Sequence, residues 1–326
     1  MARVRIDRYW SVALLVLAIL VLPRFVPSYA AFELTFVGAY AIGILGLTIL
    51  TGTNGQISLG HGAFFAIGGY AVAILGQKLG VPYWVSVPVA ALLSGFVGLV
   101  LGLVALRLEG VYLALATFAL AVATPSTLKH FKSLTGGSQG LALSSLTPPG
   151  PLHGVIDSEQ WLYYVTWILA GALFLVTWIA LRGRLGRALR AIRDNEVAAI
   201  SFGVNPQRYK TFAFGWSAAY AGVAGSIVAI ATGFVSPDTY SVALSLALVT
   251  GAVLGGIDTL WGALLGGVIV EFLPLLVQKI NPAAPSVVYG IALVLFMIFL
   301  PGGIARTVQS LLQPLRLRRG IHHARS

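Results

Sequence analysis

The sequence predicts an all-α, polytopic membrane protein, and three features of its composition predict it. Hydrophobic residues make up 58% of the 326 residues, charged residues make up 10%, and the mean hydropathy is +0.90. Soluble domains are instead about half apolar and a quarter charged. Gly is abundant, at 38 residues, and small residues suit the close packing of helices in lipid.

Apolar runs that could cross a bilayer follow one another along the chain. Since a crossing helix needs about 20 apolar residues, we expect about ten transmembrane helices, within a range of about eight to eleven. The pair 241–257 and 260–278 is also compatible with a re-entrant element, because Gly255, Gly256 and Asp258 lie at their junction. The ten expected spans are 10–30, 34–52, 57–77, 84–106, 110–128, 160–181, 211–233, 241–257, 260–278 and 286–305.

The positions of Lys and Arg predict the orientation of these spans. Cytoplasmic loops of membrane proteins carry an excess of these residues. With the N-terminus inside, sixteen of the 21 Lys and Arg fall in the cytoplasm and five fall outside. We therefore expect both termini in the cytoplasm, including a basic tail at 306–326. The five outside residues are Arg24, Lys78, Lys129, Lys132 and Lys279.

Residue usage excludes several classes of function. The net charge of +11 does not indicate nucleic-acid binding, because the positive charges gather in loops beside apolar spans. The absence of Cys excludes disulfides and thiolate metal sites. Neither a GxxxxGK[ST] loop nor an HExxH motif occurs. We expect no catalytic residue, metal or cofactor in this chain, so uphill transport would need an ion gradient or another subunit.

The longest segment expected outside the membrane is 129–159. Its glycines and prolines, among them Gly136, Gly137, Pro148 and Pro149, predict a loop rather than a folded domain. The segment is large enough to offer a docking surface to a partner. An ordered plug or a simple connector is equally compatible with its composition.

Glu271 is the one carboxylate well inside an expected span. Ionisable groups at membrane depth are costly, and they usually face a cavity or a partner. Glu271 could belong to a permeation path or a proton relay. It could instead be a structural residue that is hydrogen-bonded inside the bundle or at a subunit contact. We favour the structural role, because no Lys or Arg lies inside a span to complete a relay.

A run of glycines and polar residues at 51–71 interrupts the apolar pattern. Glycine permits tight turns and close backbone approach, and the polar groups cannot face lipid. Discontinuous helices that line a substrate path have this character, although close helix packing explains the glycines equally well. A lone His61 without nearby ligands is not expected to bind metal. The candidates for a translocation path are Asn54, Gln56, Ser58, His61, Gly62 and Glu271.

A charged segment at 182–210 separates two apolar runs and holds seven Lys and Arg. Its length predicts a docking function, because a simple chain reversal needs only a few residues. Leu189 and Ile192 form part of an apolar stripe at helical spacing, opposite a row of arginines. Such a helix could lie on anionic lipid or enter a groove of a soluble partner. Asp194 and Glu196 beside the arginines favour the protein contact.

Together these motifs resemble the permease subunits of the branched-chain amino-acid class of ABC importers, the LivM-type permeases. The resemblance covers most of the chain, from residue 38 to residue 304. Several motifs of this length in order are specific for the family. The motifs are GQISLGHGAFFAIGGY (55–70), LRLEGVYLALATFALA (106–121), LTGGSQGL (134–141), GRALRAIRDNEVAAISFGVNPQRYKTFAFGWSAAYAGVAGSIVA (186–229), FVSPDTY (234–240), VLGGIDTLWGALLGG (253–267) and PGGI (301–304).

The resemblance implies one transmembrane permease domain over 1–326, in the bacterial cytoplasmic (inner) membrane. It implies a complex with a second homologous permease, two ABC ATPase subunits that bind ATP and Mg, and an extracytoplasmic solute-binding protein. The implied solutes are branched-chain amino acids or a related small polar solute, such as urea, an amide or another amino acid. Membrane lipid is a partner, and nucleic acid is not.

In this family the cytoplasmic segment supplies a coupling helix that docks on the ATPase subunits. The general importer pattern is Glu-Ala-Ala, three residues, Gly. Here Val197 separates Glu196 from Ala198 and Ala199, so one extra residue precedes the alanine pair. The residues that the resemblance assigns to ATPase coupling are Arg187, Arg190, Arg193, Asp194, Asn195, Glu196, Ala198, Ala199 and Gly203.

Two rival functions are considered beside the ATP-driven importer. A self-sufficient secondary transporter or channel would use Glu271 or His61 as its ion-coupling group. A scaffold without transport activity would use the charged segment to recruit a cytosolic enzyme. The docking segment and the family motifs favour the importer, which works by alternating access.

Overall fold

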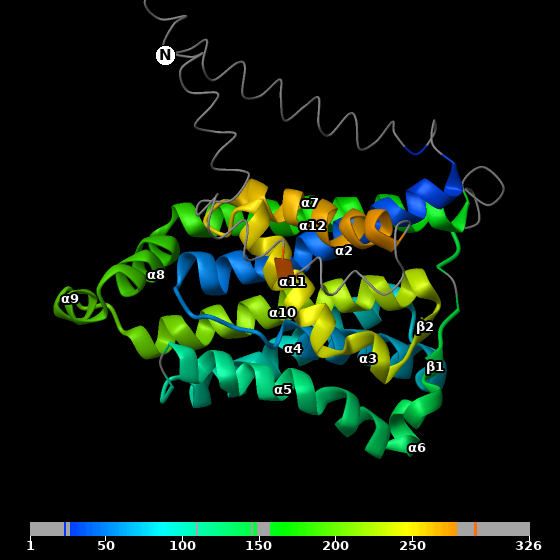
Figure 1. Ribbon diagram of the computed structural model, residues 1–326, viewed down its shortest axis with the longest axis horizontal. Coiled ribbons are helices and arrows are strands. Elements are labelled where there is room, and N and C mark those ends of the chain that lie inside the picture. The colour runs from blue at the N-terminus through cyan, green and yellow to red at the C-terminus, as the bar shows by residue number, and fades with distance from the viewer. Residues whose placement is uncertain are drawn as a thin grey trace, which may run out of the picture.

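The structure, a computed structural model, describes residues 23, 27–108, 110–144, 146–148, 157–278 and 290–291. These residues form a bundle of helices with one short two-stranded ribbon (Figure 1). Seven helices in the described part are long and apolar enough to cross a membrane. The expected all-α, polytopic membrane fold is therefore confirmed.

The elements have the following bounds. The long apolar helices are α2 (Ser28–Leu47) with its π-helical continuation (Thr48–Thr53), α3 (His61–Leu79), α4 (Tyr83–Ala105), α5 (Val111–His130), α7 (Ser158–Arg182), α10 (Pro206–Thr232) and α12 (Leu260–Gln278). The shorter elements are α6 (Lys132–Thr135), a 3-10 turn (Gly137–Gln139), β1 (Leu141–Ala142), α8 (Arg184–Asp194), α9 (Glu196–Ser201), β2 (Phe234–Val235), a second 3-10 turn (Pro237–Tyr240) and α11 (Val242–Gly255).

Eight of the ten expected spans correspond to described helices, although two differ from the expectation. The span 57–77 becomes a helix only from His61 onward. The span 241–257 forms α11, which has only 14 residues. The remaining two spans, 10–30 and 286–305, and the tail 306–326 lie largely or wholly outside the described residues.

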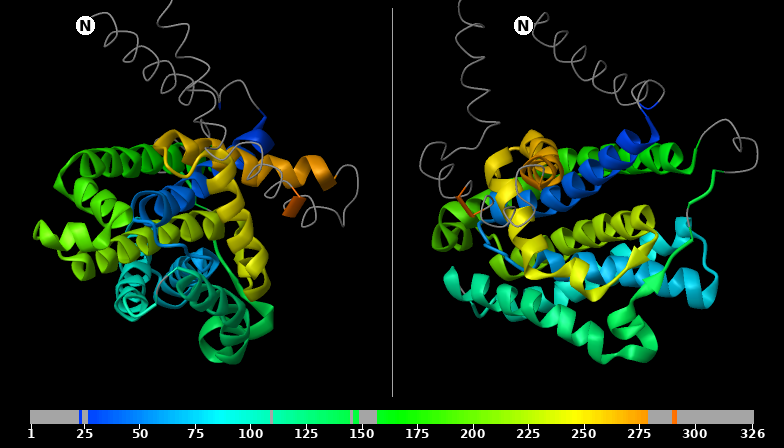
Figure 2. Two further views of the ribbon diagram at one scale, coloured as in Figure 1. Left: turned by 60° about the vertical axis from the view of Figure 1, so that its left-hand side comes forward. Right: turned by 45° about the vertical axis from the view of Figure 1, so that its right-hand side comes forward.

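The long helices run side by side between two distinct ends of the bundle (Figures 1 and 2). At the hairpin end, α8 and α9 project beyond the other helices. At the strand end, β1 pairs antiparallel with β2, so that Leu141 faces Val235. The π-helical end of α2 and the last turn of α7 lie at the hairpin end, beside α8.

Three inner helices are surrounded by four outer helices. In the most apolar windows of α10, α2 and α3, 89%, 78% and 61% of the residues are buried, whereas in α4, α5, α7 and α12 the share is 28% or less. The outer helices turn large apolar side chains outward, such as Leu92, Phe96 and Ile168. An apolar exterior over helices of this length is the arrangement that a lipid environment stabilises.

Small residues bring α3 and α10 into backbone contact. A Cβ atom added to Gly68 would collide with the backbone of Gly222, and one added to Gly225 would collide with the backbone of Phe65. Helices in lipid associate through such close packing, because burial of apolar surface provides no driving force there. The abundance of glycine thus follows from the distances between helix axes.

The described part of 129–159 is folded onto the strand end. Thr135 Oγ1 donates to Leu128 O at 2.6 Å, and Lys129 forms a 2.7 Å ion pair with Asp238. Leu143 N–H donates to Gly233 O at 2.8 Å, which extends the ribbon. This part of the segment is an ordered connector, and a docking role for it stays a prediction.

Gly68→Ala is expected to destabilise the bundle by about 1–3 kcal/mol, because the added methyl group overpacks a backbone contact. Gly171→Ala on α7 is the matched control, since nothing lies within 4 Å of the added carbon. The control is expected to be neutral or to stabilise α7 by up to about 1 kcal/mol. Thermal loss of helicity of the full chain in detergent measures both, and equal melting temperatures would contradict the role of close packing.

Candidate functional site

The most irregular backbone inside the bundle is the segment 54–60, between the end of α2 and the start of α3. The chain makes no regular helix there, and Gly55 has a φ of +78°. His61 directly follows this segment and contacts Ser217. Ser217 lies about 16 Å from the start of α10, at about 1.5 Å per residue, so His61 lies deep in the bundle. Backbone without helical hydrogen bonds is stable at this depth only when protein or a water-filled cavity surrounds it. The connection between α2 and α3 thus enters the bundle as non-helical backbone, which is one of the two arrangements that the glycine-rich run allows.

His61 is fully buried, and hydroxyl groups lie beside both of its ring nitrogens. Nε2 lies 2.8 Å from Ser217 Oγ, and Nδ1 lies 3.4 Å from Ser58 Oγ. Since the Ser217 hydroxyl donates its only proton to Gly46 O at 2.7 Å, its oxygen must accept from His61 Nε2–H. The network therefore places a proton on Nε2, and it joins α2, α3 and α10 through one histidine.

Two further hydroxyl groups satisfy backbone donors of the interrupted segment. Leu59 N–H donates to Thr117 Oγ1 of α5 at 3.0 Å, and Gly62 N–H donates to Ser245 Oγ of α11 at 2.9 Å. Thr117 and Ser245 are both buried. The first turn of a helix leaves N–H groups without intrahelical partners. In the first turn of α3, a hydroxyl group of α11 accepts from the Gly62 N–H.

Asn54 and Gln56 lie at the start of the same connection. Asn54 Nδ2 donates to Gln56 Oε1 at 2.7 Å, and Thr51 Oγ1 donates to Gln56 O at 2.9 Å. Asn54 Oδ1 is buried and has no hydrogen-bond partner in the described part of the chain. Five of the six path candidates thus lie along this connection and the first turn of α3, which we call the interrupted-helix junction: Asn54, Gln56, Ser58, His61 and Gly62.

Glu271 lies elsewhere, and the expectation that it is the one carboxylate inside a span is wrong. Its side chain on α12 faces that of Glu33 on α2. Glu33 is 7% exposed, and its Oε2 atom has no hydrogen-bond partner in the described part of the chain. The predicted span begins at residue 34 and therefore excludes Glu33, whereas α2 begins at Ser28, directly after Pro27.

The projecting hairpin, formed by α8 and α9, is attached to the bundle by both apolar and charged contacts. Leu189 and Ile192 of α8 are buried against the bundle. Arg193 donates to Gly52 O at the end of α2, and it forms a 2.7 Å ion pair with Asp258 before α12. Arg190 Nη2 donates to Leu181 O at 3.2 Å. These arginines hold α8 against the ends of α2, α7 and α12.

Local sequence signals define the short helix α9. The side chain of Asn195 accepts from Ala198 N–H at 3.0 Å and caps its start. Gly203, with a φ of +79°, follows its end and adopts a conformation that favours glycine. Glu196 forms a 2.5 Å ion pair with Lys210, and Ala199 is buried.

The tip of the hairpin is apolar and exposed, which the sequence reading did not single out. Val197 is 75% exposed, Ile200 is 54% exposed and Phe202 is 88% exposed. All three lie at α9, which projects farthest from the bundle (Figure 1). Their spacing at i, i+3 and i+5 can be seen in the sequence. Only the fold shows that they lie on the projecting hairpin and not on a membrane-spanning helix. Exposed apolar groups gathered in this way mark an interaction site.

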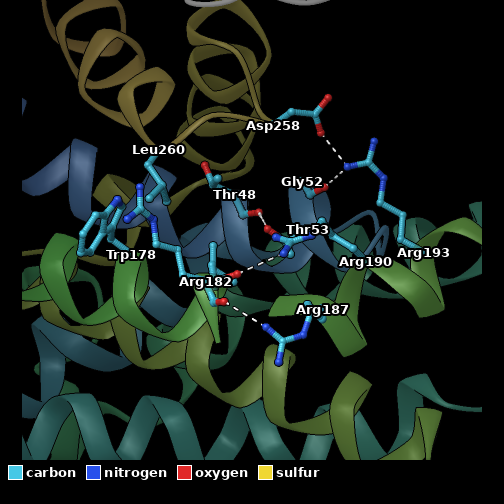
Figure 3. Close-up of a pocket in the computed structure, with 11 residues that line it drawn as sticks. Thr48, Gly52, Thr53, Trp178, Arg182, Arg187, Arg190, Arg193, Asp258 and Leu260 are labelled. Carbon is cyan, nitrogen blue, oxygen red and sulfur yellow. Dashed lines mark hydrogen bonds and ion pairs between the residues drawn. The ribbon is translucent and has the colours of Figure 1, made fainter. Parts of the chain in front are cut away.

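A cavity of about 590 Å³ lies where α8 meets the ends of α2, α7 and α12 (Figure 3). It is distinct from the interrupted-helix junction, since none of the five junction residues lines it. In the described part of the chain no group of three or more His, Cys, Asp or Glu is placed to hold a metal ion. The lining residues are Thr48, Gly52, Thr53, Trp178, Leu181, Arg182, Arg187, Arg190, Arg193, Asp258 and Leu260.

The fold and these sites define a multi-pass membrane protein with an interrupted transmembrane helix and a projecting hairpin. Residues 29–300 match the family described as "Branched-chain amino acid transport system / permease component". The chain belongs to this family, and the resemblance to LivM-type permeases is confirmed.

Individual relatives agree with this family. The chain is 33% identical over 322 residues to the high-affinity branched-chain amino acid transport system permease protein LivM of Escherichia coli K12, covering 91% of this chain and 75% of LivM. It is 29% identical to LivH of the same strain, covering 83% and 92% of the two chains. It is also 29% identical to the autoinducer 2 import system permease protein LsrC of E. coli O157:H7, covering 81% and 76%. No solved structure matches the chain.

Ser217→Ala is expected to destabilise the full chain by about 1–3 kcal/mol, because it removes the acceptor of a buried His61 N–H. Ser226→Ala on the same helix is the matched control. Its hydroxyl only donates to two carbonyl oxygens, those of Gly222 and Gly68. Thermal unfolding in detergent compares them, and a loss in the control as large as that in Ser217→Ala would contradict the proposed network.

Glu271→Gln is expected to preserve assembly and to lower solute uptake by less than about threefold, because the Gln amide can donate to the Glu33 carboxylate. Glu271→Ala leaves Glu33 buried beside an apolar group and should reduce the amount of folded protein. Uptake normalised to the protein in the membrane separates the two effects. Complete loss of uptake by Glu271→Gln, with normal assembly, would make Glu271 a mechanistic residue.

Proposed function

We propose that the chain is one transmembrane subunit of an ATP-driven ABC importer in the bacterial inner membrane. The observation that carries this proposal is the hairpin, which is held by buried and charged contacts and ends in an exposed apolar tip. A loop that only reversed the chain would need neither feature. In this proposal the hairpin end faces the cytoplasm, as do both termini.

The proposed complex contains a second homologous permease, two ATPase subunits and an extracytoplasmic solute-binding protein. ATP and Mg belong to the ATPase subunits, so this chain performs no catalysis. LivM and LivH are named as permeases of branched-chain amino acid transport systems, which supports those amino acids as the solutes of this chain. LsrC, named for autoinducer 2 import, shows that the relatives are not confined to amino-acid systems.

The hairpin supplies coupling in two parts. Val197, Ile200 and Phe202 enter an apolar groove on an ATPase subunit, because they are the exposed apolar groups at its tip. Arg190 and Arg193 connect the hairpin to the membrane-spanning helices, since both donate to backbone carbonyl groups of those helices. The segment 182–210 is thus a coupling segment. Its apolar residues dock on the ATPase subunit, and its arginines transmit the motion of that subunit to the transmembrane helices.

Motion of the hairpin has a continuous route to the interrupted-helix junction. Arg193 holds Gly52 O, which lies in the π-helical end of α2 immediately before Asn54. Residues 57–60 have no helical hydrogen bonds to break, and glycine contacts such as that of Gly68 on Gly222 lack interlocking side chains. Two packings of α3 against α10 are therefore accessible, which alternating access requires.

Membrane vesicles that contain the chain, the second permease, the ATPase subunits and the binding protein test this function. Uptake of leucine, isoleucine or valine is expected only with ATP inside and binding protein outside. Urea serves as an alternative solute in the same assay. Uptake by this chain alone, driven by a proton gradient, would refute the importer and favour a secondary transporter. Binding of a cytosolic enzyme without any solute flux would favour the scaffold.

Phe202→Asp is expected to reduce co-purification of the ATPase subunits about tenfold or more, because it places a charge in an apolar contact. ATP-dependent uptake should fall in parallel. Phe131→Asp is the matched control, since Phe131 is also exposed but lies at the strand end. Unchanged co-purification by Phe202→Asp would remove the tip from the docking surface.

A further inference from the structure

The cavity behind the hairpin is strongly positive. Four arginines line it, and Asp258 is the only acidic side chain among the lining residues that the structure describes. One of the four positive charges is therefore compensated by a carboxylate, in the Arg193–Asp258 ion pair. Three guanidinium groups remain without an acidic partner in the cavity, so its chemistry favours an anion.

Contacts with the bundle position these guanidinium groups, although all four arginines are exposed. Arg190 Nη2 donates to Leu181 O at 3.2 Å, and Arg187 Nη1 lies 3.4 Å from Arg182 O. Arg182 lies over the ring of Trp178, 3.8 Å from its centroid. Each guanidinium carries five N–H donors, so these contacts leave donors for a ligand. Figure 3 shows Arg190 and Arg193 directed toward Thr53 and Gly52 at the end of α2, Arg182 beside Trp178, and Arg187 directed toward the backbone of Arg182.

The cavity lies at the level where the bundle surface changes from apolar to charged. On α7, Leu175, Val176 and Ile179 are each more than half exposed, as lipid-facing residues are. Trp178, which lies between them, and Arg182, nearly one turn beyond Ile179, line the cavity together with the apolar Leu260. Trp is enriched where hydrocarbon meets headgroups. The ligand thus has a charged part and an adjacent apolar part.

We propose that this cavity binds the phosphate of an anionic phospholipid, with its acyl chains along α7. A volume of about 590 Å³ accommodates a glycerophosphate headgroup. Guanidinium groups bind phosphate through paired N–H donors, and basic pockets between transmembrane helices hold lipid headgroups in other proteins. The inner leaflet as the source rests on the proposed orientation of the chain, whereas the phosphate chemistry does not.

This ligand would have a consequence for the hairpin. The phosphate would contact arginines of α8 while the acyl chains lie beside Trp178 of α7, so the lipid would connect α8 to α7. Lipid would then stiffen the connection through which the hairpin acts on α2. A carboxylate of an ATPase subunit is the rival occupant, and it is less favoured because the apolar docking tip lies on α9, farther from the bundle than the cavity.

The test is a lipid titration of the detergent-purified full chain, monitored by native mass spectrometry without ATPase subunits or transport. Phosphatidylglycerol, phosphatidylcholine and inorganic phosphate are the three probes. Arg187→Gln/Arg190→Gln removes two cavity arginines. Arg184→Gln/Arg208→Gln is the matched control, because these residues are exposed like Arg187 and Arg190 but neither lines the cavity. Helicity and monodispersity of each variant establish that it is folded.

Phosphatidylglycerol is expected to bind wild type more tightly than phosphatidylcholine. Each arginine near anionic lipid contributes about fivefold, so the cavity double variant should lose about tenfold or more in affinity and the control should lose less than about twofold. Thr53→Phe, which fills the cavity and retains every arginine, should also weaken binding. This second variant decides the question if the first one does not fold.

Three results would overturn the proposal. Equal losses in the cavity and control variants would mean diffuse attraction of lipid to positive charge. Saturation of the cavity by inorganic phosphate, without preference for lipid, would identify a soluble phosphate compound as the ligand. Unchanged lipid binding, together with loss of the ATPase subunits in a separate co-purification of the cavity variant but not of the control, would assign the cavity to a partner carboxylate. None of these results depends on whether the complex transports solute.

Discussion

The structure depends on one constraint: backbone N–H and C=O groups at membrane depth must find partners within the protein. Most helices meet it internally, and residues 54–56 donate to carbonyl groups at the end of α2, but the rest of the connection to α3 does not. Thr117 of α5 and Ser245 of α11 accept from Leu59 N–H and Gly62 N–H, and Ser217 of α10 pairs with the side chain of His61. The break therefore fixes which helices must surround α3, and it places a polar cluster inside an otherwise apolar bundle.

The same constraint explains why the inner helices approach so closely. A hydroxyl group reaches a backbone donor on another helix only when the two backbones are near, and glycine at positions such as Gly68 and Gly225 permits that distance. Close contact through small residues gives many weak attractions and little interlocking of side chains. The bundle is thus well packed around His61 and still has surfaces that can shift.

The hairpin and the junction are parts of one structural unit. Arg193 contacts the end of α2 directly before the break and also contacts Asp258 directly before α12. A displacement of α8 is therefore transmitted to two membrane-spanning helices at once. The cavity beside these contacts concentrates positive charge, because Arg182 of α7 and three arginines of α8 line it.

Hydropathy and the positions of Lys and Arg are local properties, so the sequence alone determined the membrane class, the described helices, the charged hairpin and the family. The glycine and polar run also indicated the break, since a helix of that composition cannot face lipid. Only the tertiary structure decided which side chains contact one another. His61 meets Ser217 across 156 residues, Glu33 meets Glu271, and Arg190 and Arg193 contact the bundle while Phe202 is exposed. Such pairings depend on which helix faces are adjacent, and hydropathy carries no information about that choice.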